Sequence, residues 1–436
     1  MQAINPYSGR VFGIAHSLGR TDATALIHVD TNRFIATTAT RDVLRVELPS
    51  VNGTFTVTTL SRTVAPVSRL ARVPCVSGCF NLNLITGTGP IGPTSRAQGF
   101  LPGDFNGDGK TDLAITGEDG LDAVIHILHG DGTGKFNAVA RHVLGAGRTV
   151  ASGKLVLAQA NSDTRPDLLA AWDTGGFFGF AGGRISVLPG TADGKFAAPL
   201  DPPITTIPTA SGFTAGSFDG VGTDDLIFAD GPVRFLRGDA NGTFTGNPAG
   251  IETLQPDLST QLVELADLNG DGRNDLIRLG ELLATHVNSS TTASFQMNTD
   301  FGGGDVMELG DFDGDGKADL FVTGYSAFVL VFPGNGDGTF RPSLAVFSGQ
   351  LSGSFPRFAV GDLDGDGRSV VIMPDQYRSH ALVLQRPGRQ NAYAITADIA
   401  LATQPIAARI ADVNSDGNPD ILILGIAGTV EVILAR

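Results

Sequence analysis

Five short acidic segments hold the residues of this sequence that are best able to do chemistry. Each segment places Asp or Asn at its first, third and fifth positions and Gly at its sixth, and four of the five end in Asp at the ninth. Carboxylates this close together repel one another unless a cation holds them. Calcium accepts six to eight oxygen ligands in flexible geometry, which side chains at alternate positions and the carbonyl at position 7 can supply. We therefore predict calcium in these segments, about four to five Ca2+ ions in all.

The predicted ligands occupy positions 1, 3, 5, 7 and 9 of each segment. From the first segment to the last they are Asp104, Asn106, Asp108, Lys110, Asp112; Asp267, Asn269, Asp271, Arg273, Asp275; Asp311, Asp313, Asp315, Lys317, Asp319; Asp362, Asp364, Asp366, Arg368; Asp412, Asn414, Asp416, Asn418 and Asp420. Val370 stands at position 9 of the fourth segment, which leaves that site one ligand short. Gly107 and Gly109 allow the backbone to wrap the ion. Magnesium fits less well because it prefers rigid octahedral geometry with several waters retained.

An EF-hand is the obvious alternative, and the segments fail both of its requirements. An EF-hand loop ends in a bidentate Glu at position 12 and is flanked by helices. Here position 12 is Ile115, Arg278, Val322, Met373 or Ile423. The flanking residues form apolar runs typical of strands instead of showing helical periodicity.

The acidic segments recur at a regular interval. The last four begin 44, 51 and 50 residues apart. The longer interval after Asp104 contains two eroded copies, at 159–167 and 217–225, and a weaker copy lies at 28–32. A chain of 436 residues exceeds the size of one hydrophobic core, so a repeat architecture explains its length.

Each repeat predicts four strands. The acidic loop joins the first two, a third follows at 123–128, 184–188, 233–236 and 327–332, and a Gly-rich turn introduces the fourth. Four-stranded units repeating about every fifty residues indicate an all-β propeller. We expect one propeller domain over residues 1–436, with eight blades favoured and seven the alternative. A strand within Met1–Ile14 is expected to close the ring, and about 60–95 to be an insertion.

The runs Gly103–Gly109 and Gly310–Gly316 resemble the FG-GAP, or VCBS-type, repeats of integrin α-subunit propellers, bacterial surface proteins and calcium-containing fungal lectins. The resemblance covers nearly the whole chain. It implies a propeller fold and bound calcium. It implies less about function, because such propellers bind proteins, bind glycans, or accompany lyase and dehydratase domains.

Composition restricts the partners. The formal net charge is −15, and the basic residues form no cluster, which argues against nucleic-acid binding. Sixteen of the 45 acidic residues lie in the five segments, and five divalent ions would reduce the charge to about −5. No stretch is long and apolar enough for a membrane span, and the first residues, Met1–Tyr7, have neither the basic nor the apolar region of a signal peptide. The calcium argument places the protein outside the cell or on its surface.

The two cysteines, Cys75 and Cys79, lie four residues apart. No second pair or histidine nearby completes a zinc site. A local disulfide is expected in an oxidising compartment, and two free thiols fit the same spacing.

Ligand-binding residues are expected on the face opposite the calcium loops, where the connections between second and third strands lie. The candidates are aromatic and polar residues of those connections: Trp172, Phe177, Phe178, Tyr325, Tyr377, Arg378 and His380. Exposed aromatic side chains suit stacking on sugars or anchoring a protein, and packing between blades is the alternative.

No motif of a hydrolase, zinc protease or phosphate-binding loop occurs. The sequence therefore favours a non-catalytic module that binds glycans or an extracellular protein. A polysaccharide lyase is the alternative, and it would need Arg, His and Tyr converging in a deep central cleft.

Overall fold

A computed structural model describes the chain in two compact units, Met1–Ile85 with Arg436, and Thr86–Ala435. Side chains are described mainly in the second unit. The residues described are the strands of 3–4, 11–12, 23–30, 33–38, 42–47, 56–62 and 83–85, and then 96–120, 122–145, 153–173, 183–200, 212–220, 222–229, 233–245, 260–280, 283–288, 294–298, 306–323, 329–347, 357–386 and 393–435.

The first unit contains a two-stranded and a four-stranded antiparallel sheet. Their strands are β1 (Ala3–Ile4), β2 (Val11–Phe12), β3 (Ala23–Asp30), β4 (Arg33–Thr38), β5 (Asp42–Glu47) and β6 (Thr56–Arg62). The weak repeat copy at 28–32 falls where β3 is followed by β4. The Cys75–Cys79 segment lies outside the described residues, so its disulfide stays a prediction.

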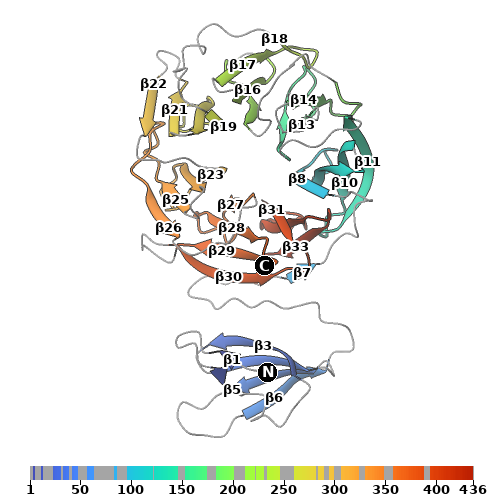
Figure 1. Cartoon of the computed structure of the whole chain (residues 1–436), viewed down its shortest axis with the longest axis vertical. Helices are drawn as coiled ribbons and strands as arrows, with labels where there is room; N and C mark the ends of the chain where they lie inside the picture. Colours follow the sequence, from blue (N-terminus) through green and yellow to red (C-terminus); the bar gives the residue numbers. More distant parts are fainter. Residues whose placement is uncertain are drawn as a thin grey trace. The chain divides into compact units, whose positions relative to one another are not determined.

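The second unit consists of antiparallel sheets that follow one another along the chain, and all but the last are built only from neighbours in sequence (Figure 1). The first three sheets comprise β8 (Arg96–Gly103), β9 (Asp112–Asp119), β10 (Asp122–Gly130) and β11 (Phe136–Gly145); β12 (Leu155–Ala158), β13 (Asp167–Asp173) and β14 (Gly183–Leu188); and β15 (Phe213–Gly216), β16 (Asp225–Ala229), β17 (Val233–Gly238) and β18 (Phe244–Thr245). The β12–β14 sheet has three strands, and a bridge from Val187 to Leu200 lies at its outer edge.

The next three sheets have four strands each. They comprise β19 (Thr260–Ala266), β20 (Asp275–Gly280), β21 (Leu283–Val287) and β22 (Ser294–Asn298); β23 (Val306–Gly310), β24 (Asp319–Thr323), β25 (Val329–Phe332) and β26 (Leu344–Phe347); and β27 (Ala359–Gly361), β28 (Val370–Asp375), β29 (His380–Gln385) and β30 (Ala394–Ala400). The last sheet has the order β31-β32-β33-β7, formed by β31 (Pro405–Ala411), β32 (Asp420–Gly425), β33 (Val430–Leu434) and β7 (Asn83–Ile85).

Apolar runs explain why the middle strands are buried. Every residue of β20, β28, β32 and β33 is buried, because both faces of these strands are covered. Hydrophobic clusters lie between successive sheets: Phe105, Ile125 and Leu188 pack together between the first two, and Phe312, Phe321 and Phe358 between the β23–β26 and β27–β30 sheets. The core is therefore divided among the interfaces between sheets instead of lying in one centre.

The sheets of the second unit form a ring in Figure 1. Hydrogen bonds connect its first and last sheets: Ala97 N donates to Ile426 O at 3.0 Å, and Thr111 Oγ1 donates to Asp412 O at 2.7 Å. The first strand of each sheet lies innermost, and β8 contacts both β12 and β31. The loops that follow these strands therefore meet at one end of the ring.

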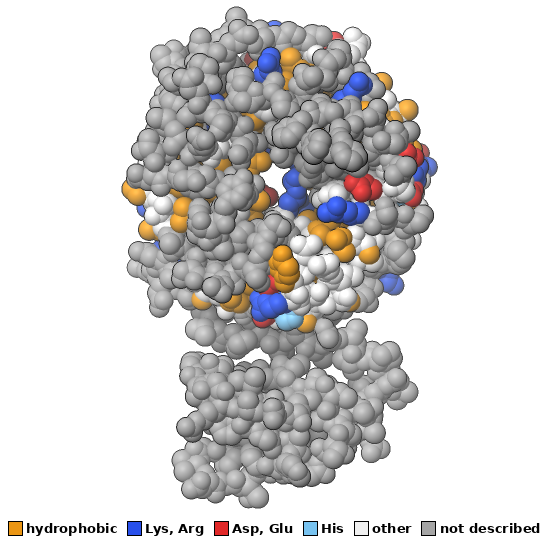
Figure 2. Space-filling view, in the orientation of Figure 1, with side chains coloured by type: hydrophobic (Ala, Val, Ile, Leu, Met, Phe, Trp, Pro, Cys, Tyr) orange, Lys and Arg blue, Asp and Glu red, His pale blue; other side chains and the backbone are white. Residues whose placement is uncertain are grey.

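Charged side chains lie near the middle of the ring. Lys154 Nζ is 2.9 Å from Glu264 Oε2, and Glu264 Oε1 accepts from Thr214 Oγ1 at 3.3 Å. Desolvation raises the pKa of Glu308, whose neighbouring charges include Arg409 and Arg357. A cavity of about 210 Å³ lies beside Glu264 and Glu308, and Figure 2 shows basic side chains beside a central opening.

The all-β prediction is confirmed, and so are the third strands and the repeats. The acidic loops and both eroded copies join the first two strands of their sheets. The prediction for Met1–Ile14 is wrong, because β1 and β2 pair with each other and β7 occupies the outer position beside β33. No helix among the described residues is long and apolar enough to cross a membrane.

Candidate metal centre

The aspartate at position 1 organises each acidic loop. In the third loop Asp311 Oδ1 accepts the N–H of Gly314 at 2.6 Å, and Oδ2 accepts that of Gly316 at 2.7 Å. Asp104, Asp267 and Asp362 accept the same two N–H groups of their own loops, and Asp412 accepts that of Gly417. The backbone therefore curls around the first carboxylate.

Positions 3 and 5 bring further oxygens to the same place. The carboxylates of Asp311, Asp313 and Asp315 offer ligand atoms within 4.8 Å of one another, and so do those of Asp362, Asp364 and Asp366. The first, second and fifth loops carry Asn at position 3, whose Oδ1 accepts the N–H of position 5 in each. In all five loops the residue at position 7 donates its N–H to the carboxylate at position 5.

Two observations show that these residues fit a cation. Asp313 Oδ1 is buried and has no hydrogen-bond partner. The pKa of Asp364 is raised by burial and then by the negative charge of Asp366. A divalent ion would satisfy the first oxygen and offset the repulsion at the second, and carboxylate oxygens are the ligands that calcium prefers.

Two glycines in most of the loops have left-handed backbone. Gly314 and Gly316 have φ of 77° and 79°, and the first, second and fourth loops repeat this pair. A Cβ on Gly316 would have no atom within 4 Å, so conformation and not space requires glycine. The fifth loop has Ser415 at φ 58° in place of the first glycine.

Gly316→Ala is expected to destabilise the protein by about 1 kcal/mol, because alanine is strained at positive φ. Denaturant unfolding measures the loss. Ser415→Gly is the matched control, since it relieves the same strain and should act in the opposite direction. An unchanged midpoint for both variants would contradict this account.

The aspartate at position 9 is buried in every loop that has it, and it joins the loop to the neighbouring turn. One carboxylate oxygen accepts the N–H of position 2 or 3, and the other accepts an N–H at the end of the third strand or just after it. The pairs are Phe105 and Gly130 for Asp112 (3.1 and 2.9 Å), Asn161 and Gly190 for Asp167 (3.1 and 2.8 Å), Phe218 and Gly238 for Asp225 (3.2 and 3.3 Å), Leu268 and Asn288 for Asp275 (2.9 and 2.8 Å), Phe312 and Gly334 for Asp319 (2.9 and 2.7 Å), and Val413 and Ala435 for Asp420 (3.0 and 2.8 Å).

This role needs no metal. Burial raises the pKa of Asp319 and of Asp420 to about 6 despite these hydrogen bonds. Position 9 was predicted as a metal ligand, and that stays a prediction, whereas its role in the fold is visible. The sequence signal was the retention of Asp167 and Asp225 in loops that have lost Asp at position 1.

Arginine accompanies the remaining acids of the eroded loops. Arg165 forms an ion pair of 3.0 Å with Asp163, and Arg237 forms one with Asp219. Both loops have lost Asp at position 1, where Gln159 and Ser217 stand. In these two loops, which have fewer acidic residues, the positive charge beside the carboxylate at position 5 or 3 thus comes from an arginine side chain.

The structure corrects one ligand-binding candidate. Trp172 is only 6% exposed and packs in the cluster between the first two sheets of the second unit. Its Nε1 donates to Ser186 Oγ at 2.8 Å, and Arg184 lies 5.7 Å from the ring centroid. Packing between sheets explains this residue. Phe177, Phe178 and Tyr325 lie outside the described residues.

The other candidates share the turn between β28 and β29. Tyr377 is 66% exposed. Arg378 pairs with Asp375 at 2.6 Å and with Asp398 at 3.4 Å, and His380 Nδ1 lies 2.5 Å from Asp398. The structure therefore brings these three together at an exposed turn, where two of them are paired with carboxylates.

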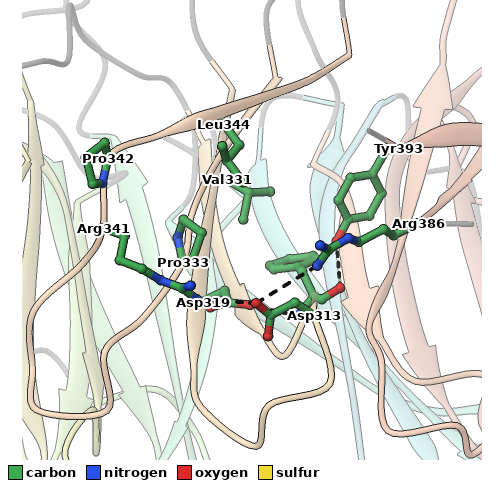
Figure 3. A pocket seen from close by; sticks show the side chains of 10 residues that line it. Asp313, Asp319, Val331, Pro333, Arg341, Pro342, Leu344, Arg386 and Tyr393 are labelled. Atoms are coloured by element: carbon green, nitrogen blue, oxygen red, sulfur yellow. Dashed lines mark hydrogen bonds and ion pairs between the residues drawn. The ribbon is translucent and has the colours of Figure 1, made fainter. Parts of the chain in front are cut away.

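Sequence reasoning missed a pocket of about 260 Å³ beside the third acidic loop. Arg341 and Arg386 lie on opposite sides of Asp313 in this pocket (Figure 3). Tyr393 forms another wall, and its hydroxyl donates to Phe312 O at 3.3 Å. No signal in one repeat could reveal the pocket, since its walls come from two sheets.

Antiparallel sheets in a ring, with acidic loops after their innermost strands, are the architecture of a β-propeller. Residues 104–170 and 311–373 match the FG-GAP-like repeat family, so the chain carries FG-GAP-like repeats. No curated protein sequence matches the chain.

Several solved structures are similar in fold. BBS1N in complex with ARL6DN, soaked with mercury, has a TM-score of 0.53 at 14% identity, and the lead-soaked complex has 0.50 at 12%. Each alignment covers 81% of this chain and 97% of the other. The WD40 domain of Toxoplasma gondii coronin has a TM-score of 0.49 at 13% identity, with 84% and 88% covered. At 12–14% identity, the two BBS1N structures show a shared fold and nothing about function.

Proposed function

We propose that this chain is a calcium-stabilised, non-catalytic binding module of a secreted or cell-surface protein, which recognises a glycan or a protein partner. The observation that carries the proposal is the group of Asp311, Asp313 and Asp315. Their carboxylates converge within 4.8 Å, and one buried oxygen of Asp313 has no partner. Such a group is stabilised by a bound divalent cation.

The propeller in this proposal has seven blades, the sheets that run from β8 to β33 with β7 at the outer edge of the last. The hydrogen bonds of Ala97 and Thr111 to the last sheet support a closed ring. This count favours the seven-bladed alternative over the eight blades that the sequence favoured.

The proposed extracellular location is supported by calcium supply. EF-hand loops in extracellular modules bind calcium with Kd of roughly 10⁻⁴–10⁻³ M, and exposed acidic loops of similar affinity would be filled only at the millimolar calcium found outside cells. The ring of similar blades supports a binding role, and the similar BBS1N structure is a complex with ARL6DN. A partner surface on the face opposite the calcium loops, including Tyr377, remains part of the proposal.

Tyr393 does not supply the general base that the lyase alternative requires. Burial raises its pKa, and its hydroxyl is engaged by the carbonyl of Phe312. A general base needs a pKa near the working pH, so this tyrosine is unsuited to abstract a proton.

Calcium titration by calorimetry tests the proposal. Wild-type protein should bind several ions, and Asp315→Ala should bind one fewer because position 5 of the third loop is lost. Asp337→Ala is the control, since Asp337 lies in a turn of the same sheet and accepts from Thr339. Absence of calcium binding by the wild type would overturn the proposal.

A glycan array paired with a lyase assay tests the class of function. We expect binding without release of unsaturated products from uronic polysaccharides. Release of such products would favour the enzyme.

A further inference from the structure

The pocket beside the third acidic loop combines two arginines with apolar walls. Its lining includes Val331, Pro333, Pro342 and Leu344 from the β23–β26 sheet, and Arg386 and Tyr393 from the next sheet. Leu344 is among the exposed large hydrophobic residues. The pocket thus offers an apolar surface and cationic groups to one bound molecule (Figure 3).

Both guanidinium groups approach one carboxylate of the calcium loop. Arg341 Nη2 lies 3.3 Å from Asp313 Oδ2 and 3.9 Å from Asp315 Oδ2, and Arg386 Nη1 lies 3.9 Å from Asp313 Oδ2. Separations of 3.9 Å are beyond hydrogen-bond reach. Asp313 therefore accepts a hydrogen bond from Arg341 and attracts Arg386, from the next sheet, by charge alone.

The charge of this site depends on the metal. Lys317 lies 3.8 Å from Asp315 Oδ2, Arg341 and Arg386 lie within 3.9 Å of Asp313 Oδ2, and the side chain of Arg368 lies beside Gly314 of the same loop. Calcium at the loop would add two positive charges to this group and would engage the unpartnered Oδ1 of Asp313. The added positive charge would favour a second anion beside Arg341.

We propose that this pocket binds a carboxylate-bearing ligand of about one sugar ring, such as a uronic acid unit of an acidic glycan, and that it does so when the third loop holds calcium. The inference rests on the proposed function. A planar guanidinium matches a carboxylate in geometry and charge. The volume of about 260 Å³ lies just below the usual range for small-molecule sites, so a single ring fits. The apolar walls match the C–H face of a sugar.

Calorimetry on the full chain tests the inference, with glucuronic acid as the probe and glucose as the uncharged control. In millimolar calcium glucuronic acid should bind and glucose should not. Arg341→Gln and Arg386→Gln should each weaken binding about tenfold or more, because each removes charge-assisted hydrogen bonds. Arg237→Gln is the matched control, since Arg237 pairs with Asp219 at position 3 of an eroded loop, and it should change nothing.

Chelator and a second probe complete the test. Chelation should abolish glucuronic acid binding. By linkage, glucuronic acid should increase the affinity for calcium by the same factor by which calcium increases the affinity for glucuronic acid. N-acetylaspartate distinguishes a sugar from an acidic peptide, and tighter binding of this probe would overturn the sugar assignment. If the protein binds calcium but neither carboxylate, or if the arginine variants bind as well as wild type, the inference fails and the proposed function stands. If calcium itself does not bind, both fail.

Discussion

Removal of calcium is expected to lower the thermal midpoint by on the order of 10 °C. An ion that binds only the folded state stabilises it by about 2.7 kcal/mol at a hundredfold excess over Kd, and four to five sites add their contributions. For a chain of this size that sum corresponds to a shift of this order. Scanning calorimetry in excess calcium and in excess chelator measures it.

Magnesium in place of calcium is the control for ionic strength and general charge screening. Magnesium should raise the thermal midpoint much less than calcium does, because flexible loops with several oxygen ligands suit the larger calcium ion. A midpoint that is the same in chelator and in calcium would show that the acidic loops are stable turns without metal.

Asp167→Ala is expected to destabilise the protein by about 3 kcal/mol in calcium and in chelator alike. The side chain of Asp167 is fully buried and accepts from Asn161 N and Gly190 N. Its loss leaves two partly buried N–H donors without this acceptor. Because this loop lacks Asp at position 1, the effect should not depend on metal.

Urea denaturation of Asp167→Ala under both conditions measures the loss. Asp163→Ala is the control, because Asp163 is partly exposed and its ion pair with Arg165 should contribute little. Loss of stability in calcium alone would mean that position 9 acts through an ion even in an eroded loop.

The sequence predicts the local features well because a short segment determines them. Alternating aspartates, the glycines at positive φ and the apolar runs on either side specify a loop between two buried strands. The residue at position 2, Phe105 or Phe312, anchors the loop in the core between sheets. These features repeat, and repetition made the prediction of four-stranded sheets secure.

Features that depend on two repeats are harder to predict. The pocket requires Arg341 and Arg386, which are 45 residues apart and approach the same carboxylate only after two sheets pack together. The expected outer strand was misplaced because the segment before Arg96 carries only one weak copy of the repeat, at 28–32, from which to locate its strands. Trp172 had two interpretations, a ligand contact and packing between blades. Its strand buries it, which agrees with the second.

The charged residues in the middle of the ring give each repeat a fixed place in the order. The acidic loops of different sheets look alike, but Lys154 pairs with a glutamate of β19, and Glu308 lies near Arg357, just before β27, and Arg409 of β31. Exchange of two sheets would separate Lys154 from Glu264 and Glu308 from its neighbouring arginines, and would leave these charges without their partners near the axis. Copies that share a surface motif therefore differ in the side chains that they carry inward, and a rearranged order of units would need new charge pairs at the axis.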